Sequence, residues 1–142
     1  MYGLDPHTGT HNIVIRNNTV HDHGAMGIIC SLNCYNVTIE NNTVFNSAGS
    51  GIMFSRNMYN SIARDNIVHN ESKCIFISQS HDNEIYNNKV DSCNNGIYLF
   101  NKSFANFVHN NTIGSFNESG LRVSSDSTKN HIYSNQIAAK SR

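Results

Sequence analysis

Charged residues are scarce in this sequence, at 14% of 142 residues, whereas globular proteins average about 25%. Tryptophan is absent and proline occurs once. Ten Lys and Arg residues balance ten Asp and Glu residues, so the formal net charge is zero. A neutral chain offers no bulk electrostatic attraction to nucleic acid or to an anionic membrane. The composition therefore predicts neither of these as a partner.

Long hydrophobic runs are also missing. No apolar run reaches the roughly 18 residues that a membrane-spanning helix needs. The start of the chain lacks a basic segment followed by an apolar one, which is the pattern of a secretory signal. Because Met1 lies directly before the densest group of titratable residues, we expect the chain to be part of a longer protein. These features by themselves leave the cellular compartment unknown.

Cysteine is limited to Cys30, Cys34, Cys74 and Cys93. A structural zinc site needs two close pairs, and only Cys30 and Cys34 are near each other in the sequence. We therefore expect buried free thiols at these positions. The glycine-rich nonapeptides of calcium-binding β-rolls are missing as well, so the sequence predicts no metal and no other cofactor.

A repeat of 22 to 24 residues dominates what the sequence does contain. One phrase reads YGLDPH, MGIICS, SGIMFS, KCIFIS, NGIYLF and SGLRVS, and a second phrase in step with it reads IRNNTV, IENNTV, ARDNIV, IYNNKV, VHNNTI and IYSNQI. Both alternate apolar and polar residues, which is typical of short strands separated by Asn, Ser and Gly turns. Sustained helical periodicity is absent, leucine is too scarce for leucine-rich repeats, and propeller blades need about 40 residues.

These exclusions favour an all-β fold, a right-handed parallel β-helix (solenoid) of about six coils. We expect residues 1–142 to form one domain of this kind within a longer β-helix. The second phrase carries an Asn that tolerates the left-handed turn conformation and can form a hydrogen-bonded ladder between coils, so we interpret this column as structural. Its members are Asn18, Asn42, Asn66, Asn88, Asn111 and Asn135.

The alternation in the first phrase assigns the two faces of its strands. The predicted inward columns are Leu4, Ile28, Ile52, Ile75, Ile97 and Leu121, and Pro6, Cys30, Phe54, Ile77, Leu99 and Val123. The predicted outward columns are Asp5, Ile29, Met53, Phe76, Tyr98 and Arg122, and His7, Ser31, Ser55, Ser78, Phe100 and Ser124. An apolar and aromatic stripe is unusual on a solvated face. It indicates a surface that a sugar chain, a neighbouring subunit or another segment covers.

The segment YGLDPH resembles the catalytic signature Y-G-x-D-P-H of the mannuronan C5-epimerases, which modify alginate. The segments HDHGAMGI and SGIMFSRNMYNS are similar to later coils of these enzymes. Repeats of this type (PbH1 repeats) also occur in many sugar-binding and sugar-cleaving proteins, so only the opening motif is specific. The resemblance implies a periplasmic or extracellular isomerase that acts on an acidic polysaccharide by epimerising mannuronate.

Epimerisation at C5 removes a proton next to a carboxylate and returns one on the opposite face. It requires a base, an acid and a group that neutralises the carboxylate. The resemblance implies that His7 accepts the proton, that Tyr2 donates one, and that Asp5 either orients or polarises His7 or, in its protonated form, binds the substrate carboxylate. The residues expected to bind substrate are His11, His23, Met53, Phe76 and Tyr98.

The motif departs from the family pattern at two points. Thr8 stands where some members have a second acidic residue. The family also places a cationic side chain just before the glycine of a following coil, and this sequence has no Lys or Arg there. His11, His23 and Arg56 are the alternatives for that cation.

Other functions stay open at this stage. The same carbanion can eliminate its 4-O substituent, which would make the protein a uronate lyase. A non-catalytic carbohydrate-binding β-helix would use the aromatic and hydroxyl columns alone. A structural β-helix would self-assemble, and we expect a homo-oligomer through exposed coil ends or through the apolar outer face. Convergence of Tyr2, Asp5 and His7 in a groove would favour the enzyme, and spreading along a flat wall would favour the others.

Overall fold

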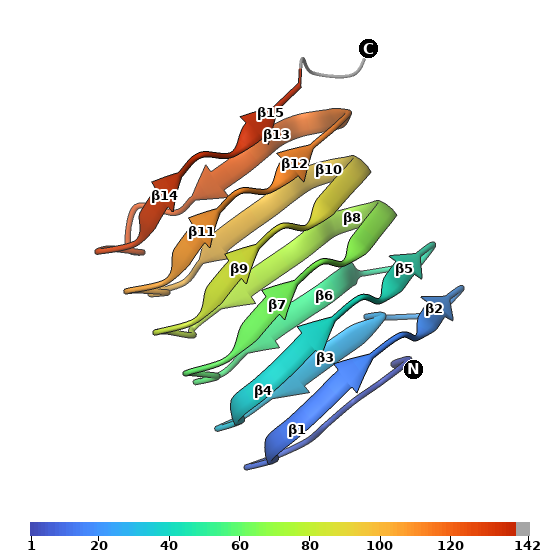
Figure 1. Cartoon of the computed structure of the whole chain (residues 1–142), viewed down its shortest axis with the longest axis vertical. Helices are drawn as coiled ribbons and strands as arrows, with labels where there is room; N and C mark the ends of the chain where they lie inside the picture. The colour runs from blue at the N-terminus through green and yellow to red at the C-terminus, as the bar shows by residue number, and fades with distance from the viewer. Residues whose placement is uncertain (139–142) are drawn as a thin grey trace.

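The computed structural model describes residues 1–138 as parallel strands wound into a solenoid, with the strands of successive coils stacked side by side (Figure 1). One sheet has six strands in the order β1-β4-β7-β9-β11-β14, one strand for each coil. The other has nine strands, β15-β12-β10-β8-β5-β2 with β13, β3 and β6 attached. All strand pairs in both sheets are parallel. The predicted all-β parallel solenoid is confirmed.

The strands are short in the first coils and longer where one strand continues around a corner of the solenoid. Their bounds are β1 His11–Arg16, β2 Thr19–His21, β3 Ile28–Ser31, β4 Tyr35–Glu40, β5 Thr43–Phe45, β6 Ser50–Ser55, β7 Ile62–Arg64, β8 Ile67–Ser78, β9 Glu84–Tyr86, β10 Lys89–Phe100, β11 Phe107–His109, β12 Thr112–Ile113, β13 Phe116–Val123, β14 His131–Tyr133 and β15 Gln136–Ile137. Residues 1–138 contain no helix that could span a membrane.

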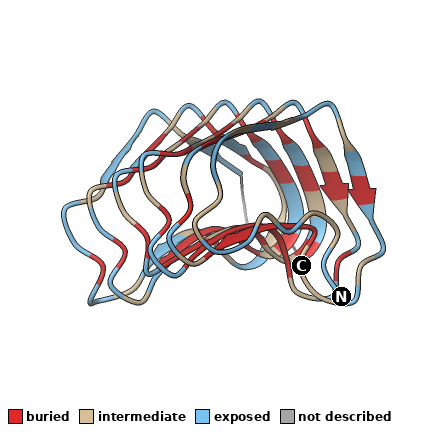
Figure 2. Cartoon of the chain, turned by 90° about the horizontal axis from the view of Figure 1, so that it is seen from below, coloured by how far each residue is buried: buried red, intermediate tan, exposed pale blue. Residues whose placement is uncertain are grey.

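The predicted inward columns form the core in the central coils. Ile28 pairs with Ile52, Ile52 with Ile75 and Ile75 with Ile97, and all four side chains are fully buried. Buried residues recur at the same places in successive coils (Figure 2). Leu4 and Leu121, which continue the column into the first and last coils, are only partly buried and pack against the core from one side.

The glycine of the first phrase is required by close packing at the corner of the coil. A Cβ atom on Gly51 would overlap the side chain of Val68 and the carbonyl oxygen of Cys74. The glycine therefore lets the backbone of one coil approach the inward valine of the next closely. Cys74 occupies the equivalent place in the fourth coil and is itself buried.

The Asn column forms the predicted ladder. The backbone N–H and Nδ2 of Asn42 both donate to Oδ1 of Asn66, at 3.0 and 3.2 Å, and the pattern repeats in every coil from Asn18 to Asn135. The left-handed conformation, however, belongs to the residue before each ladder Asn, for example Asn41 with φ 54° and Asp65 with φ 56°. The preceding residue turns the chain, and the ladder residue faces inward with its amide satisfied.

The cysteines correct one expectation. Cys74 and Cys93 form a disulfide across adjacent coils, with their Cα atoms 5.9 Å apart, so the prediction of free thiols is wrong for this pair. Cys30 and Cys34 are buried and free, as expected. Burial raises the pKa of the Cys30 thiol, and the neighbouring Cys34 adds to the increase.

Candidate functional site

The opening motif lies on the outer side of the first coil, where Leu4 forms an isolated parallel bridge with Ile28. Nδ1 of His7 lies 3.6 Å from Oδ1 of Asp5, with 63% of the histidine side chain and 31% of the aspartate side chain exposed. At this distance the two side chains are in contact but do not form a hydrogen bond. The arrangement places a carboxylate beside a solvent-accessible imidazole.

The backbone after His7 is held by the following turn and by the second coil. The Thr10 backbone N–H donates to the His7 carbonyl at 3.0 Å, and the Gly9 N–H donates to the Leu32 carbonyl at 2.9 Å. Gly9 has φ 73°, in the left-handed region that glycine adopts without strain. These bonds fix the direction in which the His7 side chain leaves the coil.

Tyr2 is 43% exposed and forms no hydrogen bond with Asp5 or His7 within residues 1–138. The structure therefore brings Asp5 and His7 into contact, and Tyr2 is hydrogen-bonded to neither of them within residues 1–138. The acid/base roles proposed for His7 and Tyr2 stay predictions.

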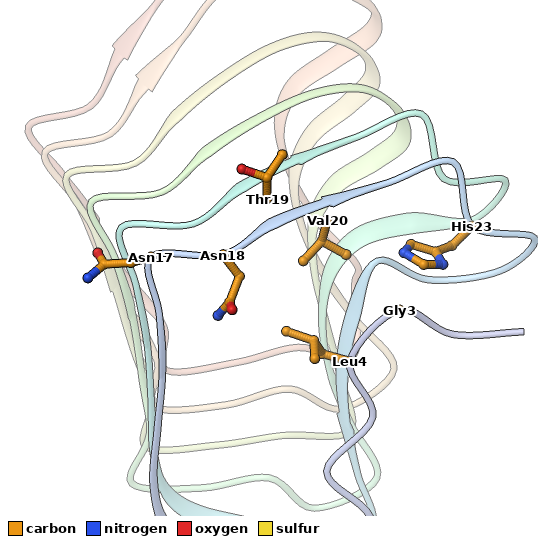
Figure 3. A pocket seen from close by; sticks show the side chains of 7 residues that line it. All are labelled: Gly3, Leu4, Asn17, Asn18, Thr19, Val20 and His23. Atoms are coloured by element: carbon orange, nitrogen blue, oxygen red, sulfur yellow. The ribbon is translucent and has the colours of Figure 1, made fainter.

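His11 and His23 lie at different places around the coil. His11 donates from Nδ1 to the Gly9 carbonyl at 2.8 Å, and its ring stacks on Tyr35 with the centroids 4.7 Å apart. His23 lies beside Gly3 and lines a hollow of about 340 Å³ at the N-terminal end of the solenoid (Figure 3). Within residues 1–138, neither side chain forms a hydrogen bond or an ion pair with Asp5 or His7.

The outer column of apolar residues is more covered than the alternation suggests. Met53 and Tyr98 are each only 9% exposed, although neither belongs to the core between the sheets. Phe76 lies between them in register and is half-buried, with its ring centroid 5.5 Å from that of Tyr98. The column lies outside the core cluster, and the rings of Phe76 and Tyr98 within it contact each other.

Two cationic side chains lie on this aromatic surface. Nζ of Lys73 is 5.1 Å from the ring centroid of Phe76, and Cζ of Arg122 is 5.0 Å from that of Tyr98. Both distances fall within the range of attraction between a cation and an aromatic ring. The outer face therefore presents positive charge above an apolar base.

A third cation lies next to the opening motif. Nε of Arg56 donates to the Ser31 hydroxyl at 3.0 Å, and Nη2 donates to the same oxygen. Ser31 follows His7 in the outward column, one coil further on, and adjacent coils are about 4.8 Å apart. From the sequence alone, Arg56 was only one of three alternatives for the group that neutralises the substrate carboxylate. The sequence signal for this role was that Arg56 directly follows Ser55, which belongs to the same outward column as Ser31 and lies one coil further on. An arginine side chain is long enough to reach from there to the preceding coil.

Sequence reasoning missed one buried acid. Glu71 is 5% exposed, and both of its carboxylate oxygens accept the Ser47 backbone N–H at 3.1 Å. Burial raises its pKa to about 7. The Ser47 hydroxyl beside it is buried and has no hydrogen-bond partner within the described residues. Glu71 lies at a corner of the coil rather than in the outward columns, so we assign it no part in the site.

Metal ligands do not gather in the part of the chain that the structure describes. Among residues 1–138, no three His, Cys, Asp or Glu side chains lie close enough together to hold a metal ion. Histidines and carboxylates occur there as pairs, such as His21 with Asp22 at 2.6 Å and His109 with Glu84 at 2.7 Å.

Comparison with known proteins gives one family and one group of structures. Residues 7–118 match the family model "Periplasmic copper-binding protein (NosD)". No curated protein matches the sequence. The crystal structure of the periplasmic alginate epimerase AlgG matches with a TM-score of 0.82 and 20% identity, over 96% of this chain and 42% of that chain. A double mutant of the same enzyme matches with a TM-score of 0.86 and 21% identity over the same shares.

At this identity the likeness to AlgG shows the fold alone. The chain spans 42% of the length of that epimerase. The predicted resemblance to the mannuronan C5-epimerases is therefore confirmed for the β-helix architecture, and the activity is a separate question.

Proposed function

This chain belongs to the family of the periplasmic copper-binding protein NosD, and on its β-helix scaffold we propose a site that epimerises mannuronate at C5 in an alginate-like polymer. The observation that carries the proposal is the Asp5–His7 pair with Arg56 anchored one coil away on Ser31. The three side chains supply a base, a group that stabilises its protonated form, and a cation for the substrate carboxylate. The likeness of fold to AlgG supports the same direction.

Copper does not fit the donor set of the described residues. Copper(II) favours several imidazole ligands and copper(I) favours thiolates. No cluster of three such side chains occurs within residues 1–138. The two free thiols are buried, and the raised pKa of Cys30 disfavours the thiolate that would bind a metal. We therefore derive no step through copper.

Binding of the polymer uses the cations along the outer face. Arg56, Lys73 and Arg122 come from different coils, so a chain of uronates running along the solenoid axis meets them in turn. Their carboxylates pair with the cations, and the apolar faces of the sugar rings pack on the aromatic column. A bidentate guanidinium suits the carboxylate at the reacting sugar.

Proton transfer then runs through the opening motif. The His7 imidazole takes the proton from C5, and the electron pair of the C–H bond moves into the carboxylate. Asp5 stabilises the imidazolium, and Arg56 stabilises the added negative charge on the carboxylate. The Tyr2 hydroxyl gives a proton to the opposite face of C5, and the proton held by His7 returns to the Tyr2 oxygen through solvent. The proton count is unchanged over the cycle.

The test is an NMR assay of polymannuronate, polyguluronate and pectate before and after incubation with the protein. We expect new guluronate signals from polymannuronate. The variant His7→Ala should lose activity by about 10²–10⁴-fold, because positioned proton transfer contributes that much. The matched control is His21→Ala, since His21 also pairs with an aspartate, Asp22, but lies at another corner of the coil. Equal loss in both variants, or activity that survives His7→Ala, would overturn the proposal.

A non-catalytic carbohydrate-binding protein is the second candidate. The aromatic column with Lys73 and Arg122 above it favours this function, because binding needs no acid/base pair. In that case, calorimetry would detect binding of an acidic polymer that depends on Lys73 and Arg122, while the NMR spectrum of the polymer stays unchanged. Unsaturated chain ends in the same spectrum would instead show elimination by a lyase.

A further inference from the structure

One corner of the coil repeats a short sequence that the proposed epimerisation does not use. Asparagine followed two residues later by Ser or Thr is the acceptor sequence for N-linked glycans. The chain has seven such sequences, which begin at Asn17, Asn36, Asn41, Asn70, Asn101, Asn110 and Asn117. Asn41 and Asn110 lie at the same corner of different coils, between β4 and β5 and between β11 and β12 (Figure 1). Asn17 shares this corner but lies in the first coil, so we leave it aside.

The backbone at this corner presents the acceptor amide and the hydroxyl on the outside of the solenoid. Asn110 turns the chain with φ 53° and is exposed, and Asn41 does the same with φ 54°. The next residue, Asn111, faces inward and is 1% exposed, with its amide in the ladder. Thr112 is exposed again, and it lines the same surface hollow of about 240 Å³ as Asn110. The two groups that the acceptor sequence supplies are therefore accessible together.

The nucleophile of glycan transfer is Nδ2 of the asparagine, and its hydrogen bonds differ between the sequences. Nδ2 of Asn36, Asn70 and Asn117 donates in each case to an asparagine Oδ1 of the preceding coil. Within residues 1–138, the side chains of Asn41 and Asn110 form no hydrogen bond. An amide that already donates within the protein has to break that bond before it can react. The corner amides do not.

The sequence that begins at Asn101 lacks an accessible hydroxyl. Its Ser103 is fully buried, and the Ser103 hydroxyl donates to the Phe100 carbonyl at 2.8 Å. Exposure and hydrogen bonding thus single out Asn41 and Asn110 among the sequences beyond the first coil.

The disulfide between Cys74 and Cys93 belongs to an oxidising compartment, and N-linked glycans are added to proteins that leave the cytoplasm. We propose that Asn41 and Asn110 are acceptor sites for N-linked glycans, which a transferase takes from an oligosaccharide on a polyprenyl phosphate or pyrophosphate. Nδ2 forms a bond to the anomeric carbon of the sugar, while the bond from that carbon to the phosphate oxygen breaks. The lipid phosphate leaves with the electron pair of that bond, and Nδ2 gives up one proton. The two corners carry no residue of the epimerisation site, so this modification does not rest on that function.

The test uses the purified, folded chain, a single-subunit oligosaccharyltransferase that recognises Asn-X-Thr, and its polyprenyl-linked donor. Mass spectrometry of proteolytic peptides reads the occupancy of each asparagine, and circular dichroism establishes that each variant is folded. We expect glycans on Asn41 and Asn110. Thr112→Val keeps the shape of the side chain but removes the hydroxyl, so it should abolish the glycan on Asn110 and leave the one on Asn41.

Asn87 provides a matched control at the same corner. It has φ 54° and is exposed, but Lys89 stands in the place of the hydroxyl residue. A hollow of about 230 Å³ lies beside both residues, as at Asn110. Lys89→Thr should therefore create an additional glycan on Asn87, whereas Lys89→Val should create none.

A folded wild-type chain that gains no glycan on Asn41 and none on Asn110, while a free acceptor peptide in the same mixture is modified, would overturn the proposal. A folded Lys89→Thr variant that stays unmodified at Asn87 would overturn it as well. Occupancy of Asn36, Asn70 and Asn117 equal to that of the two corner sites in the folded chain would show that the corner geometry selects nothing.

Discussion

Arg56 reaches back by one coil and places its guanidinium on the hydroxyl of Ser31, the residue that follows His7 in the outward column. The hydrogen bonds fix a long and otherwise mobile side chain on the outer face. A cation is thereby held next to the coil that carries the Asp5–His7 pair. In the proposed mechanism, Arg56 is the cation that pairs with the substrate carboxylate.

Replacing Arg56 should therefore reduce turnover more than it reduces stability. Arg56→Gln keeps a donor for Ser31 but removes the charge, and we expect kcat to fall by about 10²-fold or more, as when one transition-state donor is lost. The NMR assay measures turnover, and a denaturant titration measures stability. Arg16→Gln is the control, because Arg16 is an exposed arginine of β1 in the other sheet. Equal turnover in the two variants would remove Arg56 from the mechanism.

The core columns make a prediction about stability. Ile52 is fully buried in a central coil, so Ile52→Ala should lower the free energy of unfolding by about 2–5 kcal/mol. Ile137→Ala, in the same kind of inward column but half exposed in the last coil, should cost much less. Chemical denaturation monitored by circular dichroism compares the two. Similar losses would mean that burial does not differ between the coils as described.

The disulfide predicts how many cysteines react with a thiol reagent. Unfolded protein without reductant should react with a thiol reagent at two cysteines, Cys30 and Cys34, and at all four after reduction. Reduction, or the double change Cys74→Ser and Cys93→Ser, should lower the free energy of unfolding by about 3 kcal/mol, because the bond closes a loop of nearly 20 residues. Four reactive thiols before reduction would contradict the pairing.

The fold could be predicted from the sequence because each repeat contains the pattern of one coil within 22 to 24 residues. The alternation around Ile52 assigns one residue inward and the next outward, and the constant period stacks each column. The same reasoning placed the Asn ladder, although it assigned the left-handed conformation to Asn42 rather than to Asn41 before it. The repeat period determines the register of the columns, so the ladder was predicted correctly. The period does not determine the φ angle of each turn residue, so the left-handed residue was assigned wrongly.

Side-chain contacts between adjacent coils could not be predicted in the same way. Cys74 and Cys93 are 19 residues apart, less than one repeat, so they occupy different places in their coils and meet only at a corner. The burial of Tyr98 depends on neighbours such as Arg122, which lies over its ring from the next coil. The length and direction of a side chain decide these contacts. For the site, the sequence predicted that Asp5 and His7 lie on the same side of one strand. The hydrogen bond from Arg56 to Ser31 could be found only in the structure.

Glu71 should make stability depend on pH. Its pKa is about 7 in the folded protein and 4.5 for the ordinary group, so the folded state holds a proton that the unfolded state has lost between these values. The free energy of unfolding therefore falls as pH rises from about 4.5 to about 7, in total by roughly 3 kcal/mol, and levels off above that. The informative quantity is the difference in the free energy of unfolding between wild type and Glu71→Gln, because the contributions of the other titratable groups cancel in it.

Glutamine resembles the protonated acid and can still accept the Ser47 N–H, so Glu71→Gln should resemble the wild type near pH 4.5 and exceed its stability above pH 7. Denaturant titrations at intervals of pH give the two curves. Glu118→Gln is the control, because it makes the same chemical change at a side chain that is 58% exposed beside Arg122. The gap between Glu71→Gln and the wild type should widen with pH, whereas the curve of Glu118→Gln should run parallel to that of the wild type between pH 5 and 8. A constant gap for Glu71→Gln would show that this carboxyl ionises as easily in the folded chain as in the unfolded one.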